Sequence, residues 1–217
     1  LLQVNAAMRK LEEEDASLDD KHFLNNLAWT WSSPEKAKDF LFHLLKCRVL
    51  FDKYVLKREF ARDYKETGKW SLQRLEKYSE RKKKGDKPKY VGTLGDESND
   101  NKKLRTLQSC LRITYTSPKT MHWITVILSN LLENEATDII SVLENYCKKK
   151  VVDSDYQNRK GFGFERIVFC YLDYLIYRDG YSYDGKEIIS SMQEDWQFQF
   201  RSSVEHFYPQ HPVEGEQ

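Results

Sequence analysis

Positively charged side chains that could neutralise nucleic-acid phosphates gather in three stretches of the sequence. These side chains are Lys53, Lys57 and Arg58; then Arg81, Lys82, Lys83, Lys84, Lys87 and Lys89; and then Lys102, Lys103 and Arg105. Trp70, Tyr78 and Tyr90 lie near the middle stretch and could stack on exposed bases. The alternative, which the charge pattern alone favours, is a solvated charged loop that serves solubility. DNA contact by these residues is therefore a hypothesis.

A metal site on a predicted helix is the second candidate. His43 and Cys47 are four residues apart and would share one face of that helix. A tetrahedral site needs further ligands, and no second pair stands at a suitable spacing in the sequence. We therefore expect a buried cysteine beside a partly exposed histidine.

The C-terminal residues combine a strand pattern with a polar motif. Trp196, Phe198 and Phe200 alternate with polar residues, and this period of two predicts a strand. The predicted strand leads into a Glu-His-Phe-Tyr-Pro-Gln run at residues 205–210. Taken alone, the Glu-His pair would be an exposed polar pair near a chain end.

A strand followed by Glu-His-x-x-Pro-Gln resembles the opening of the HNH-like nuclease domain in GmrSD-type modification-dependent restriction proteins. The segments Phe51–Glu59, Leu107–Leu111 and Met121–Ile124 are similar to the helical region that precedes that nuclease domain. The resemblance covers essentially all 217 residues, although only the Glu-His-x-x-Pro-Gln run is a sharp motif. In this family a ParB-like domain comes first, a helical middle region follows and the nuclease closes the chain. The sequence would then be the helical middle region and the start of the nuclease domain.

The resemblance implies roles for three residues in the intact parent protein. His206 would be the general base that activates water, because a histidine pKa lies near neutrality. Glu205 would orient His206, and His211 is a weak candidate ligand for the divalent metal of the nuclease. The sequence ends at Gln217, before the later Asn and His residues of the family motif. We therefore expect a fragment that binds no cofactor and is inactive by itself.

Composition favours helices and an intracellular setting. With 40% hydrophobic and 13% aromatic residues but 9 Gly and 5 Pro, the chain is too apolar for disorder and has few residues for the turns of an all-β fold. The net charge is +1, so any nucleic-acid contact must come from a local patch. The four cysteines form no C-x-x-C pair and predict reduced, buried thiols. Neither a membrane span nor a signal peptide is evident, and we expect a cytoplasmic protein, bacterial by the resemblance.

The predicted architecture is all-α, an irregular bundle with a short C-terminal strand. Ser33-Pro34 is a helix start signal, and apolar residues at positions 40, 44, 47, 51 and 55 predict a helix from Pro34 to about Phe60. The predicted parts are a helical subdomain at 1–62, a charged insertion or loop at 63–101, a helical subdomain at 102–194 and the truncated nuclease start at 195–217. Trp29, Trp31 and Trp123 are expected to be packing residues whose indole N–H groups have hydrogen-bond partners.

Two functions of different classes fit these patterns. The first is a helical connector in a DNA-targeting restriction endonuclease that acts in phage defence and cleaves modified DNA, with DNA and the ParB-like and nuclease domains as partners. The second is a non-enzymatic helical module that binds another protein or a second copy of itself. The salt dependence of binding distinguishes the two functions, because phosphate contacts weaken steeply as the salt concentration rises, whereas an apolar protein interface barely responds.

Overall fold

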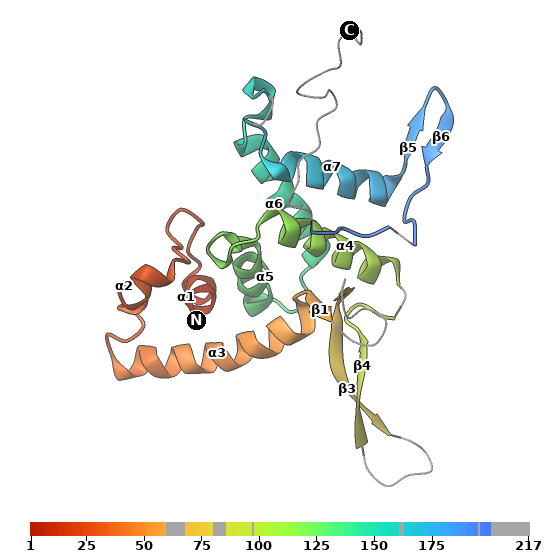
Figure 1. Cartoon of the computed structure of the whole chain (residues 1–217). Helices are drawn as coiled ribbons and strands as arrows, with labels where there is room; N and C mark the ends of the chain where they lie inside the picture. Colours follow the sequence, from red (N-terminus) through yellow and green to blue (C-terminus); the bar gives the residue numbers. More distant parts are fainter. Residues whose placement is uncertain (60–67, 80–85, 97, 161–162, 195, 201–217) are drawn as a thin grey trace.

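The computed structural model describes residues 1–59, 68–79, 86–96, 98–160, 163–194 and 196–200. Its α-helices are α1 (Leu2–Arg9), α2 (Phe23–Leu27), α3 (Pro34–Tyr54), α4 (Asn99–Thr114), α5 (His122–Glu133), α6 (Ile139–Asp153) and α7 (Arg166–Asp179). Its strands are β1 (Lys57–Glu59), β2 (Lys69–Ser71), β3 (Gln73–Ser79), β4 (Asp86–Gly92), β5 (Tyr181–Tyr183) and β6 (Lys186–Ile189). Figure 1 shows the helices as one body from which two β-hairpins extend.

The prediction of a mostly helical chain is confirmed, but the all-α class is too narrow. Within the described residues, β1–β2, β3–β4 and β5–β6 form three two-stranded antiparallel sheets. Residues 63–101, which the sequence predicts to be a charged insertion or loop, contain β2, β3 and β4. Their alternation is hidden in the sequence because charged residues occur on both faces of the β3–β4 pair, so neither face is apolar throughout.

The strand predicted around Trp196–Phe200 is not formed by the residues that the structure describes there. The backbone from 196 to 200 has no regular structure, although Phe198 is buried. The indole Nε1 of Trp70 donates a hydrogen bond to the carbonyl of Phe198 at 2.7 Å. This aromatic segment therefore covers the core by side-chain contacts instead of pairing with a strand.

A single cluster of buried side chains joins both predicted helical subdomains. Leu27 and Phe40 from the first subdomain belong to the same cluster as Leu104, Leu131 and Tyr174 from the second. Helix α5 packs on α1, α3 and α6, while α4 packs on α6 and α7. Trp123 of α5 is buried as a packing residue, but its indole Nε1 has no hydrogen-bond partner among the described residues, so that part of the prediction is wrong. Trp31 packs edge-on against Phe40 at 5.7 Å, although Trp29 and Trp31 are 42% and 53% exposed.

Helix α3 begins where the sequence predicts and ends earlier. The Ser33 hydroxyl accepts a hydrogen bond from the Lys36 amide at 3.3 Å, and Pro34 occupies the first turn. Three side chains bind the last carbonyl groups of the helix: Lys57 Nζ donates to Asp52, Thr93 Oγ1 to Lys53 and Gln108 Nε2 to Tyr54. Because these donors satisfy groups that a helix end leaves unpaired, α3 stops at Tyr54 and the chain turns into β1.

All four cysteines are free and buried, as the sequence predicts. Burial raises the pKa of Cys47 to about 11 and raises the pKa of Cys110, Cys147 and Cys170. Among the residues described, no helix combines the length and the apolar character that a membrane span requires.

Candidate nucleic-acid interface

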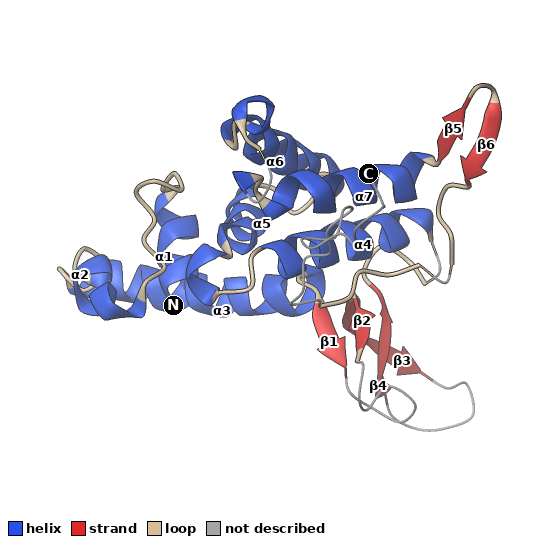
Figure 2. Ribbon diagram, turned by 45° about the horizontal axis from the view of Figure 1, so that its top comes forward, coloured by secondary structure: helices blue, strands red, loops and turns tan. Residues whose placement is uncertain are grey.

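The β3–β4 hairpin extends away from the helices and carries part of the second basic stretch. Figures 1 and 2 both show it leaving the helical body near the end of α3. The register runs from Gln73 opposite Gly92 to Ser79 opposite Asp86. Residues that lie opposite each other share one face of an antiparallel pair. One face therefore carries Arg74, Glu76, Lys89 and Val91, and the other carries Leu75, Lys77, Pro88 and Tyr90.

The hairpin presents cations and apolar groups to solvent together. The side chains of Lys77, Lys87 and Lys89 are exposed. Leu75 and Tyr90 lie opposite each other with exposed fractions of 60% and 67%. Such a ribbon offers ammonium groups for phosphates and an apolar pair for the edge of a sugar or a base.

The base of the hairpin is fixed to the end of α3. Lys57 Nζ donates to the carbonyls of Asp52, of Val55 at 3.2 Å and of Gln73 at 3.4 Å. Burial lowers the pKa of Lys57, although the nearby Asp52 carboxylate opposes the shift. The ammonium of Lys57 thus ties α3 to β3.

Gly92 and Thr93 hold the other strand at the same point. A Cβ on Gly92 would lie 2.7 Å from the carbonyl oxygen of Gly95, so the chain passes too close for any larger residue. The Thr93 amide donates to the carbonyl of Leu72 at 3.2 Å, and its hydroxyl donates to the carbonyl of Lys53. The hairpin therefore leaves the body from a fixed base.

Arg58 and Trp70 pack together and do not reach outward like the hairpin lysines. The Arg58 guanidinium lies 4.7 Å from the centre of the Trp70 ring and 4.9 Å from the centre of the Phe200 ring. Arg112 approaches the same Phe200 ring at 5.3 Å, and burial, with the like charge of Arg58, lowers the pKa of Arg112. Because Trp70 is buried, it is not available to stack on bases. Lys53 lies over the ring of Tyr54 at 4.9 Å.

The third basic stretch lies on α4, among acidic side chains. Lys102 Nζ lies 3.3 Å from the carboxylate of Glu194. Lys103 lines a cavity of about 470 Å³ with Asp100, Asp138, Ile140, Glu144, Arg178 and Asp179. Arg105 is half-buried. The acidic neighbours make this part of α4 a poorer phosphate site than the hairpin.

Several predicted site residues lie outside the described residues. These are Arg81, Lys82, Lys83 and Lys84 between β3 and β4, together with Glu205, His206 and His211. Their roles stay predictions. Within the described ranges, no group of three or more His, Cys, Asp or Glu side chains could hold a metal ion. His43 Nδ1 lies 2.9 Å from the carbonyl of Asp39, four residues earlier on α3.

Lys77 and Leu75 were not predicted from the sequence as candidate site residues, whereas Tyr90 was identified there as a residue that could stack on bases. A usable signal was present, because Leu75, Tyr78, Tyr90 and Val91 favour strands on both sides of a short charged link. The high charge of the link hid this signal.

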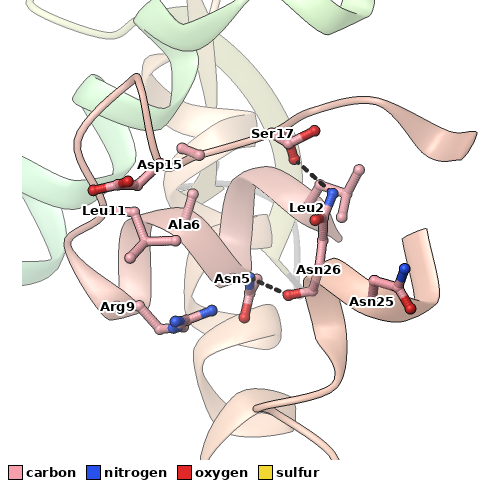
Figure 3. Close-up of a pocket in the computed structure, with 10 residues that line it drawn as sticks. Leu2, Asn5, Ala6, Arg9, Leu11, Asp15, Ser17, Asn25 and Asn26 are labelled. Carbon is pink, nitrogen blue, oxygen red and sulfur yellow. Dashed lines mark hydrogen bonds between the residues drawn. The ribbon is translucent and has the colours of Figure 1, made fainter. Parts of the chain in front are cut away.

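A second concave site lies between α1 and α2. This cavity of about 440 Å³ is lined by Leu2, Asn5, Ala6, Arg9, Leu11, Asp15, Ala16, Ser17, Asn25 and Asn26 (Figure 3). Asn5 Nδ2 donates to the Asn26 carbonyl and Asn26 Nδ2 to the Ser17 carbonyl, each at 3.1 Å. These two amides already hold the surrounding backbone.

The geometry of the hairpin suits binding through charge and surface contact. Lys77, Lys87 and Lys89 are exposed, whereas Arg74 is half-buried and ion-paired with Glu76. The base of the hairpin is fixed by the contacts of Lys57 and Thr93. Comparisons of the chain with models of protein families, with curated proteins and with solved structures found no match in any of the three.

Proposed function

We propose that this chain is a helical connector of a DNA-targeting restriction endonuclease and that its β3–β4 hairpin holds DNA. The observation that supports DNA contact is a projecting two-stranded ribbon with exposed Lys77, Lys87 and Lys89. The major groove of B-DNA admits a two-stranded ribbon of this kind. Because the chain carries a net charge of only +1, such a local group of cations would supply the attraction.

The exposed lysines and the exposed Leu75–Tyr90 pair would contact different parts of the DNA. The lysines would contact phosphates on either strand and set the position of the ribbon without reading sequence. Leu75 and Tyr90 would lie against sugar or base edges and exclude water there. Arg81–Lys84, which join the strands in the sequence, would add further cations.

The cleavage reaction belongs to the intact parent in this proposal, and its support is the Glu-His-x-x-Pro-Gln resemblance. His206 would take a proton from water, Glu205 would orient that histidine, and His211 would assist a divalent metal. The helical body would join the ParB-like and nuclease domains while the hairpin holds the DNA.

Titration of fluorescent duplex DNA at low salt tests the proposal. Replacing Lys87 and Lys89 by glutamate should weaken binding by about tenfold or more, because two attractions become repulsions. The matched control replaces Lys148 and Lys149 of α6 by glutamate, since these lysines are also exposed. It changes net charge equally and should alter affinity by less than about threefold. His206→Ala should bind like the unaltered chain.

Two results would count against the hairpin. Equal weakening by both double variants would indicate a general charge effect without a site. Absence of binding at low salt would favour the alternative, a non-enzymatic helical module that contacts protein.

A further inference from the structure

Helix α3 has a second apolar face that points away from the core. Its inner face buries Phe40, Cys47 and Leu50 against α1 and α5. Its outer face exposes Leu41 by 50%, Phe42 by 64%, Leu45 by 71% and Val49 by 64%. These outer positions recur every three or four residues, so they form one stripe along the helix.

Opposite charges stand at the two ends of this stripe. Lys38 precedes Leu45 by seven residues and Asp52 follows it by seven. Seven residues are close to two helical turns, so the three side chains lie nearly in line. Lys38 is exposed, and Asp52 is half-exposed and accepts a 2.8 Å bond from Arg48 on its own helix. The line through Leu45 thus consists of a cation, an apolar centre and an anion, and the exposed Arg48, which is paired with Asp52, borders it.

We propose that α3 pairs antiparallel with α3 of a second copy of this chain, with the two Leu45 side chains meeting at the two-fold axis. Reversal about Leu45 places Lys38 of each copy beside Asp52 of the other. It also places Leu41 against Val49 and Phe42 against Arg48 of the other copy. A two-fold interface requires this self-complementarity, in which residue i meets residue j and j meets i.

The charge pattern selects a second copy over other occupants of the stripe. A parallel pair would set Lys38 beside Lys38 and Asp52 beside Asp52, which is repulsive. A membrane surface favours a cationic rim, whereas the acidic Asp52 stands in line with Leu45 at one end of this stripe. This pairing is independent of DNA binding and would hold if the hairpin bound nothing.

The size of the stripe sets the expected affinity. Helix α3 has 21 residues and a length of about 32 Å. One face of such a helix is smaller than the ~800 Å² per partner of a standard interface. We therefore expect a dissociation constant in the micromolar range, which requires measurement at high protein concentration.

Sedimentation equilibrium of the 217-residue chain across the micromolar range tests the stripe. The unaltered chain should show a monomer–dimer equilibrium. Leu45→Glu should raise the dissociation constant by about 30-fold or more, as expected at the centre of an interface. The matched control is Val152→Glu on α6, since Val152 is 72% exposed and Leu45 is 71% exposed. Val152→Glu should leave the equilibrium unchanged.

Charge exchange and cross-linking test the antiparallel register. Lys38→Glu should weaken the dimer, and adding Asp52→Lys should restore it. Oxidation should cross-link the Lys38→Cys, Asp52→Cys double variant between copies, because the two positions are too far apart on one helix to bond. Lys38→Cys alone should not cross-link, and the native thiols are buried.

Three results would overturn the proposal. The first is a monomer at every concentration. The second is a dimer that tolerates Leu45→Glu or is not restored by charge exchange. The third is cross-linking by Lys38→Cys alone, which would indicate parallel helices.

Discussion

Gln108 shows how one side chain fixes the end of a helix 54 residues away in sequence. Its Nε2 donates to the carbonyl of Tyr54 at 2.8 Å, and its Oε1 accepts from the amide of Leu56 at 2.8 Å. The residue is fully buried. Both backbone groups lie where α3 ends and would otherwise have no partner in the helix. The position of β1, and through it of the hairpin, therefore depends on a contact that no local sequence pattern encodes.

Gln108→Ala should destabilise the chain strongly. Truncation removes the partner of one carbonyl and one amide and creates a cavity at a fully buried position, at a cost of about 2–4 kcal/mol. Urea denaturation followed by circular dichroism measures the change. Gln157→Ala is the control, because Gln157 is exposed, and it should change stability by less than about 0.5 kcal/mol. Similar stabilities for the two variants would mean that Gln108 does not hold the end of α3.

Each helix or strand was predictable to the extent that its own sequence determined it. The start of α3 was predictable because Ser33 and Pro34 act locally, whereas its end depends on Gln108 and Thr93. The β3–β4 hairpin escaped prediction because neither face is buried. The strand predicted at Trp196 and Phe198 is absent from the residues described there because these side chains are packed against others without strand pairing. The two rings pack on each other at 4.6 Å, and Trp196 stacks on Tyr177 at 5.3 Å. These packing contacts involve alternating aromatic residues, and that alternation resembles the pattern of a strand.

Asp138 at the start of α6 gives a prediction about pH. The hydrogen bond from the Ser141 hydroxyl, with the Ser141 and Ile140 amides, lowers the pKa of Asp138. Because the folded pKa is depressed, this stabilisation is present above the unfolded pKa and is lost as pH falls through the folded pKa. Asp138→Ala should cost about 1 kcal/mol near neutral pH and less in acid.

Asp138→Asn separates the cap from the charge. The amide keeps an acceptor oxygen and does not titrate, so the stability difference from the unaltered chain should shrink as pH falls below about 4. Urea denaturation at about pH 7 and about pH 3 measures both variants. A difference that is constant across this range would contradict a role for the ionised carboxylate.

In the whole molecule, one core supports both the β3–β4 hairpin and the outer apolar stripe of α3. Leu27 and Phe40 share the cluster with Leu104 and Tyr174, so both predicted helical subdomains contribute to the body that holds the hairpin base. The candidate DNA site was predictable only in part. Lys87 and Lys89 were identified from charge, but the ribbon that presents them depends on long-range pairing.

The salt dependence of duplex DNA binding shows whether the lysines of the β3–β4 hairpin contact phosphates. In a plot of log affinity against log salt, replacing Lys77, Lys87 and Lys89 by alanine should reduce the slope by about 0.9 for each phosphate that is no longer neutralised. Tyr90→Ser should weaken binding and leave the slope unchanged, because it removes a stacking group without charge. A slope that is the same with and without the three lysines would contradict DNA binding by the β3–β4 hairpin.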